Sequence, residues 1–490
     1  MKNYKYIGLF LMSLGLVSCD VDNELDVIEA AMVEEVALNT NGLDFSSYVS
    51  VGASFTSGYT DGALFIAAQE SSFPNTLAGK FGTDFTQPLM NDNIGGMVFG
   101  PAVVLEPRLY FNGAGPARLP AVPTTQLTDV ISGSFNNMGI PGAKSFHLGV
   151  PGYGALNPYF GRMASSPGAT VLGDALAQSP TFFTLSEIGG NDVLGYATSG
   201  GAGEDQTGNY NPATYGGSDI TDPNVFASVF SDMVAALTAN GAKGVVANLP
   251  YVTSLPYFTT VPHNPIPLDA GTAAYVNSAY AGYNGGLLVA QSYSMIDAAE
   301  VAKRTINFIE GQNAVVIVDE DLTDLSALGI PSYRQATAND LLVLTSSSFL
   351  GTLADPSNPA SVNGVGVPLA DKWVLTDVEQ AKVKTATDAY NVTIEAVAAS
   401  NPNVALVDFK ALMTEATVGV QFDEYVMNTS LVMGGLVSLD GVHLTGRGYA
   451  LMANKILAAM DAEFGSNFTT ATGGLAKAGD YTTNYSPSLR

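Results

Sequence analysis

Three residues of the 490-residue chain have the types and spacing needed for nucleophilic catalysis, and two of them lie close together. Asp440 and His443 are three positions apart in the segment SLDGVHLT, directly before an amphipathic pattern. Both side chains can then sit on one turn, where Asp440 accepts the Nδ1 proton and leaves Nε2 free to take a proton from a serine. Of the other two histidines, His147 lies in an apolar strand pattern, and His263 lies in a loop with no acid at a fixed spacing.

The candidate nucleophile is Ser54, in the segment VGASFTSGY at the end of a predicted strand. Gly52 and Gly58 flank it, and a serine just past a buried strand can present its hydroxyl group at the edge of a sheet. Gly-x-Ser is common, however, and a serine that caps a helix or a turn is the more frequent explanation of this pattern alone.

Two further segments could supply hydrogen-bond donors to a developing oxyanion. Asn191 follows a strand pattern and two glycines, and its side-chain amide can donate such a bond, whereas Asp192 is predicted to cap the next helix. Gly152 follows the predicted strand from Phe146 to Val150 and could offer a backbone N–H. Each segment also has an ordinary explanation as a turn.

The elements that must position these residues follow from the hydrophobic pattern. Short apolar runs predict strands at Tyr48–Val51, Phe146–Val150, Phe182–Ile188, Gly244–Asn248, Val315–Val318 and Val404–Asp408. Helical periodicity predicts helices at Asn224–Leu237, Ala273–Ala299, Asp377–Ala399 and Gly446–Phe464. Apolar strands that alternate with helices indicate an α/β fold with a mainly parallel sheet covered on both faces. Ligand sites in such sheets lie beyond the carboxyl ends of the strands. The segments at about 66–140, 195–222 and 250–372 are predicted to be large loop insertions around the site.

The four segments with candidate site residues resemble, in order and spacing, the sequence blocks of the SGNH hydrolases, also called the GDSL family. The resemblance runs from about residue 46 to residue 464 and implies a three-layer sandwich with a flavodoxin-like topology. It implies a carboxylic ester hydrolase (a lipase, esterase or acylhydrolase) that forms an acyl-enzyme and uses no cofactor and no metal.

The resemblance also implies a role for each site residue. Ser54 would be the nucleophile, and Asp440 and His443 would complete the triad. The oxyanion hole would be formed by the backbone N–H of Ser54, by Gly152 and by Asn191. The family's usual aspartate before the nucleophile is Ala53 here. We expect that difference to change local hydrogen bonding more than the type of reaction.

The N-terminus predicts export and a lipid anchor. Lys2 and Lys5 precede a short apolar run, which ends in a small residue and Cys19, the only cysteine of the chain. This is the pattern of a bacterial lipoprotein signal at residues 1–18, with acylation of Cys19 and an acidic tether at residues 19–45. Residues 465–490 are predicted to be a polar tail. We expect an outer-membrane lipoprotein, with display on the cell surface as an open alternative.

The charge restricts the partners. The chain has a formal net charge of −26, and loss of the signal leaves 17 basic and 45 acidic residues, a charge of −28. Such a charge repels nucleic acid and anionic lipid head groups, so the membrane must be held through the lipid anchor. The predicted partner is a small-molecule or lipid ester substrate, and the oligomeric state stays open.

Two other classes of function compete with this interpretation. A non-catalytic surface lipoprotein that binds glycan or another nutrient is favoured only by Ala53. A metal-dependent hydrolase is disfavoured because no histidine or glycine accompanies the acidic run at Asp319, Glu320, Asp321 and Asp324 at a ligand spacing. That run is predicted to be a solvated loop, or at most a weak cation site.

Overall fold

The computed structural model describes residues 35–490, and residues 38–490 form one compact unit. The predicted signal, Cys19 and most of the predicted tether lie outside the described residues. The end of that tether packs against the main core through Leu43 and Phe45. No helix in the described part has both the length and the apolar composition needed to cross a bilayer.

A five-stranded parallel sheet forms the centre of the fold. Its strands are β1 (Tyr48–Gly52), β6 (Asn137–Gly139), β7 (Phe182–Leu185), β8 (Lys243–Ala247) and β15 (Val404–Val407). They lie side by side in the order β6-β1-β7-β8-β15, and every neighbouring pair is parallel. This is the order of a flavodoxin-like doubly wound sheet, in which the direction of chain progression switches between β1 and β7.

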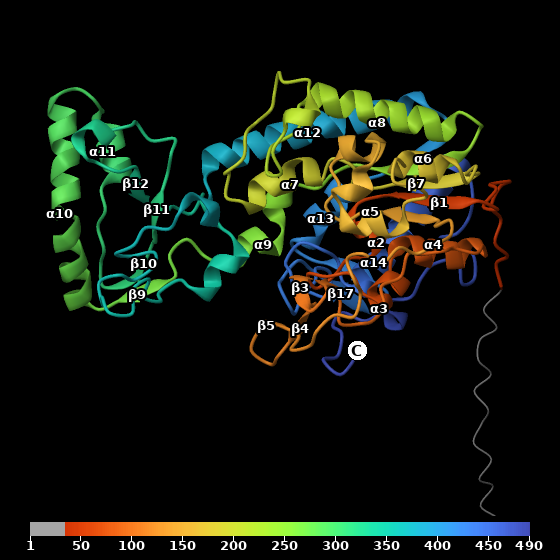
Figure 1. Ribbon diagram of the computed structural model, residues 1–490, viewed down its shortest axis with the longest axis horizontal. Helices are drawn as coiled ribbons and strands as arrows, with labels where there is room; N and C mark the ends of the chain where they lie inside the picture. Colours follow the sequence, from red (N-terminus) through yellow and green to blue (C-terminus); the bar gives the residue numbers. More distant parts are fainter. Residues whose placement is uncertain (1–34) are drawn as a thin grey trace, which may run out of the picture. The chain divides into compact units, whose positions relative to one another are not determined.

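Helices cover both faces of this sheet, as the apolar strands require (Figure 1). One face carries α6 (Val171–Leu176), α7 (Asn191–Thr198), α8 (Pro223–Thr238) and α12 (Asp377–Ser400). The other carries α4 (Phe73–Phe81) and α14 (Gly446–Phe464). The predicted α/β class and its mainly parallel sheet are therefore confirmed, as are the helices now labelled α8, α12 and α14.

The prediction of a strand at Phe146–Val150 was wrong. These residues form the 3-10 helix η1 (Ser145–Gly149), and the second strand of the sheet is β6. β6 has only three residues, Asn-Met-Gly, and is therefore too short and too polar to give an alternating apolar pattern.

Two other predictions need correction. The run at Val315–Val318 does form β11 (Val316–Val318), but this strand pairs antiparallel with β12 (Tyr333–Gln335) outside the central sheet. The helix predicted at Ala273–Ala299 is two helices, α10 (Ala270–Ser292) and α11 (Ala298–Arg304). The break contains Ser294 in the left-handed region, with φ 56°, a conformation that no helix interior tolerates.

The two largest predicted insertions contain ordered structure. Residues 66–140 include two hairpins, β2 (Met97–Phe99) with β3 (Ala102–Leu105) and β4 (Leu109–Phe111) with β5 (Pro116–Arg118). Residues 250–372 build a second hydrophobic core of their own between α10, β11 and the hairpin of β9 (Ile266–Leu268) and β10 (Gly311–Asn313).

The C-terminal residues pack against the body of the protein instead of projecting from it. Phe468 and Ala478 are fully buried, and the buried guanidinium group of Arg108 donates hydrogen bonds to the carbonyl oxygens of Tyr485 and Ser486.

Candidate active site

A tight turn at the carboxyl end of β1 presents Ser54. The strand is fully buried, and the chain then turns directly into the short helix α2 (Ser54–Ser57). Gly52 permits this turn: a Cβ atom there would lie 2.1 Å from Thr56 Oγ1 and 2.8 Å from the Ser186 carbonyl oxygen. The Ser54 carbonyl oxygen accepts a hydrogen bond from the Tyr59 N–H at 2.9 Å, which closes the turn.

Glu187 supports this turn from the neighbouring strand. Its Oε1 accepts hydrogen bonds from the backbone N–H groups of Ala53, at 2.6 Å, and Thr56, at 2.9 Å, and its Oε2 accepts one from the Thr56 hydroxyl group. Burial raises the pKa of Glu187 to about 7, although these donors act in the opposite direction. A carboxyl group thus supports the turn even though Ala53 has no polar side chain.

Asp440 and His443 form a hydrogen-bonded pair in the loop before α14. Asp440 Oδ2 lies 2.8 Å from His443 Nδ1, and both side chains are largely buried. Oδ1 accepts hydrogen bonds from the backbone N–H groups of Val442 and His443, each at 2.9 Å, and from the Ser438 hydroxyl group. Burial alone would raise the pKa of Asp440, but the His443 charge and these donors hold it well below its usual value. Asp440 is therefore ionised and fixes the orientation of the imidazole ring.

A turn that the sequence analysis did not single out holds this pair in place. Thr60 and Ala63 exchange two backbone hydrogen bonds around Asp61 and Gly62, which have φ 53° and 73°. The Gly62 N–H donates a hydrogen bond to Asp440 Oδ2 at 2.8 Å, the same oxygen that faces the imidazole. The Asp-Gly dipeptide is a known turn signal and could have identified this support, although not its target nearly four hundred residues away.

His443 packs against the turn that presents Ser54. The imidazole ring centroid is 5.6 Å from that of Phe55, the residue after the serine, and 4.6 Å from that of Tyr59. Val442, which precedes the histidine, lines one pocket together with Ser54. The structure shows no hydrogen bond between the serine hydroxyl and the imidazole; such contacts are often long without substrate.

Asn191 lies on the same pocket. It is the first residue of α7, at the carboxyl end of β7, and it lines the pocket together with Ser54. Its Nδ2 donates one hydrogen bond to the Ala143 carbonyl oxygen at 2.9 Å, which leaves the second amide hydrogen available. Ser54 and Asn191 therefore follow adjacent strands at the switch point of the sheet, where doubly wound folds bind ligands.

Asp192 does not have the predicted capping role. The residue before α7 is Gly190, and no side chain caps this helix. Asp192 is instead fully buried and accepts hydrogen bonds from the backbone N–H and the hydroxyl group of Ser145. It therefore ties α7 to η1.

Gly152 does not offer a free donor. Its backbone N–H donates to the Ala169 carbonyl oxygen at 3.1 Å, and it is not among the residues that line the pocket with Ser54. Another glycine, Gly142, lies three residues after the end of β6, in a turn that has Pro141 at its second position. Gly142 has φ 79°, and the Ala143 N–H closes the turn by donating a hydrogen bond to the Ile140 carbonyl oxygen. Within residues 35–490, no backbone hydrogen bond engages the Gly142 N–H, although Gly142, like Gly152, is not among the residues that line the pocket with Ser54.

The pocket beside Ser54 has mostly apolar walls. They come from segments that follow β8 and β15 and from the loop before α14, and include Leu249, Val252, Leu255, Met413 and Leu444. A second pocket shares Phe55, Leu249, Met413 and Leu444 with the first and continues toward Phe409 and Met452. The two pockets therefore share apolar walls, and the first of them lies beside the serine.

His147 has a structural role. Its Nδ1 accepts a hydrogen bond from the Lys144 backbone N–H, and its ring stacks on Tyr153. Burial, assisted by the Lys144 charge, lowers the pKa of His147 to about 4, so this ring is neutral near neutral pH.

Comparisons of the chain with protein-family models, curated proteins and solved structures give no match. The site must therefore be interpreted from its own geometry.

Proposed function

We propose that this protein is a serine ester hydrolase of the SGNH type that acts through an acyl-enzyme. The observation that carries the proposal is the orientation of the imidazole. His443 Nδ1 is bonded to an ionised Asp440, which leaves Nε2 on the opposite side of a ring whose centroid lies 5.6 Å from that of Phe55, the residue after Ser54. This is the arrangement that activates a serine hydroxyl group.

In the proposed cycle, His443 takes the Ser54 proton while the serine oxygen attacks the ester carbonyl carbon. The resulting oxyanion accepts hydrogen bonds from the Ser54 N–H and the Asn191 side chain. We assign the third donor to the Gly142 N–H in place of Gly152, because the Gly152 N–H is already bonded. His443 then protonates the leaving alcohol, and water hydrolyses the acyl-enzyme by the same steps in reverse.

The apolar walls of the two pockets suggest the acyl part of the substrate. Leu249, Met413 and Leu444 could contact an aliphatic acyl group attached at Ser54. Few polar side chains line these pockets that could form hydrogen bonds with the hydroxyl groups of a sugar. We therefore propose esters of aliphatic acids as substrates, with acetylated glycans a less suitable class.

The test combines labelling and turnover of the full chain. A fluorophosphonate should label the wild type at Ser54 and should not label Ser54→Ala. The same variant should lose at least about 1,000-fold in kcat on p-nitrophenyl butyrate. Ser57→Ala, three residues away, is the matched control, and it should keep the label.

The alternative, a surface lipoprotein that binds glycan without catalysis, predicts neither labelling nor turnover. Labelling of Ser54→Ala at the wild-type rate, or equal turnover by the two proteins, would refute the assignment of the nucleophile.

A further inference from the structure

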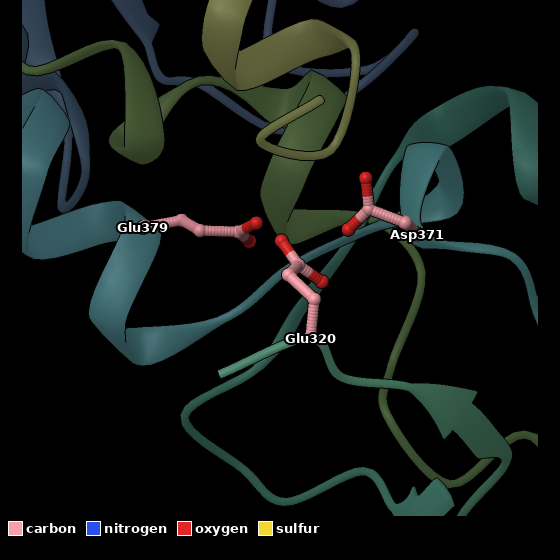
Figure 2. Close-up of side chains that lie close together, drawn as sticks. All are labelled: Glu320, Asp371 and Glu379. Atoms are coloured by element: carbon pink, nitrogen blue, oxygen red, sulfur yellow. The ribbon is translucent and has the colours of Figure 1, made fainter. Parts of the chain in front are cut away.

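Three carboxylates lie together outside the pocket of Ser54, where residues of the insertion at 250–372 meet the start of α12. Glu320 follows β11, Asp371 begins the 3-10 helix η7 (Asp371–Trp373), and Glu379 lies in the first turn of α12. One oxygen of each lies within 4.8 Å of the other two. Figure 2 shows the side chains of Glu379 and Asp371 converging on that of Glu320 from different segments.

The most buried of these carboxylates lacks a partner on its inner oxygen. Glu379 is fully buried; its Oε2 accepts the Thr376 N–H at 2.6 Å as part of the helix cap, but its Oε1 has no hydrogen-bond partner. Asp371 Oδ1 is also buried without a partner. Burial, together with Glu320, raises the pKa of both Asp371 and Glu379. An ionised carboxylate oxygen is costly to bury without a donor, so these groups keep a proton unless a cation compensates their charge.

No cationic side chain does so. Among the ion pairs of residues 35–490, none reaches Glu320, Asp371 or Glu379. The adjacent Asp319 is the opposite case, since its Oδ2 lies 2.5 Å from Arg334 Nε. Arginine therefore neutralises one acid of this loop and leaves the cluster uncompensated.

Two glycines let the backbone that follows α7 lie close to the cluster. A Cβ atom on Gly201 would lie 1.8 Å from Glu379 Oε1, and one on Gly200 would lie 2.2 Å from the Asp371 carbonyl oxygen. The φ angles of Gly200 and Gly201 are both positive, 67° and 86° respectively, and both residues follow the end of α7. Any side chain at Gly201 would displace the unpartnered oxygen.

We propose that Glu320, Asp371 and Glu379 bind a calcium ion. An all-oxygen, all-carboxylate set suits a hard divalent cation, and the absence of histidine and cysteine from the cluster disfavours zinc. Calcium accepts irregular sets of six to eight oxygen ligands, whereas magnesium demands near-ideal octahedral geometry and keeps several waters, so three carboxylates from separate segments suit calcium better. Water and backbone carbonyl oxygens would complete the six to eight ligands that calcium takes.

The ion would join two parts of the chain, the insertion through Glu320 and Asp371 and the start of α12 through Glu379. The residues that follow α7, Gly200 and Gly201, lie against both parts. Asn191 is at the other end of α7. Calcium would therefore stabilise the contact between the insertion and α12 and, indirectly, α7, the helix that begins with Asn191. This proposal does not depend on the proposed hydrolase activity.

The test measures calcium binding to the full chain after treatment with a chelator, by isothermal titration calorimetry and thermal unfolding. We expect one site with a Kd below about 100 μM and an increase in Tm of about 3 °C or more at saturating calcium. Glu320→Gln, at an exposed position, and Glu379→Gln should each weaken binding at least tenfold and remove the increase in Tm.

Asp324→Asn is the matched control, because it removes an exposed carboxylate from the same loop outside the cluster. It should bind calcium as the wild type does. Absence of calcium binding by the wild type at 1 mM would overturn the proposal. So would unchanged binding by both Glu320→Gln and Glu379→Gln, which would place any bound calcium elsewhere on this acidic chain.

Discussion

Two buried carboxylates, Asp440 beside the imidazole and Glu379 in the acidic cluster, show opposite electrostatic behaviour. The pKa of Asp440 is lowered, because His443 and four hydrogen-bond donors offset the effect of its burial. The pKa of Glu379 is raised, because burial disfavours its charge and Glu320 lies beside it, while one of its oxygens has no donor. Burial acts on both side chains, and the surrounding hydrogen-bond donors and charges determine whether the ionised or the protonated carboxyl group is more stable.

The difference shows how each region can be used. A carboxylate that is ionised and held by backbone N–H groups is suited to orienting a neighbouring base. A cluster of acids without donors is suited to an added cation, which supplies the missing charge. Glu187 is an intermediate case, since it accepts three hydrogen bonds and still has a raised pKa.

The largest expected effect comes from removing the charge of Asp440 while keeping its shape. Asp440→Asn should lower kcat on a p-nitrophenyl ester by about 1,000- to 10,000-fold, because an amide favours the wrong imidazole tautomer. Steady-state kinetics with circular dichroism as a folding check would measure it. A loss of less than tenfold in a folded variant would mean that Asp440 does not orient the base.

Thermal unfolding in chelator should separate the two carboxylates. Asp440→Asn should lower Tm by several degrees, because it removes a charge that the fold stabilises. Glu379→Gln should raise Tm by a few degrees, because it removes a charge that the fold disfavours without calcium. Shifts of the same sign in the two variants would remove the proposed contrast.

A smaller effect concerns the pH dependence of stability through Glu187. Its pKa is about 7 in the folded protein against an ordinary value of 4.5, so the folded state binds more protons between these values. Stability therefore falls as pH rises from about 4.5 to about 7.

In the Glu187→Gln variant, the free energy of unfolding should fall by about 2 kcal/mol less between about pH 4.5 and about pH 7 than it does in the wild type. Urea unfolding at pH 5 and pH 8 would measure the difference. A residual decline is expected from Asp61, whose pKa burial also raises to about 7. An unchanged decline in the variant would show that Glu187 is not the group responsible.

Much of the framework could be predicted from local sequence. The apolar runs and helical periodicity identified four of the five central strands and the helices α8, α12 and α14, because these signals arise within single elements. Asp440 and His443 could be paired because their spacing places them on one turn. The N-terminal signal and Cys19 remain predictions, since they lie outside the described residues.

What only the tertiary structure decided depends on contacts between distant segments. β6 has too few apolar residues to be detected, so the sequence pattern places a strand at Phe146–Val150 and cannot relate Gly142 to the sheet. The support of Ala53 by Glu187, the Gly62 donor to Asp440 and the meeting of Glu320 with Asp371 and Glu379 involve residues that no local pattern relates. Local periodicity determines which elements form, but burial and the pairing of polar groups across the fold determine which of their side chains meet and which carry a charge.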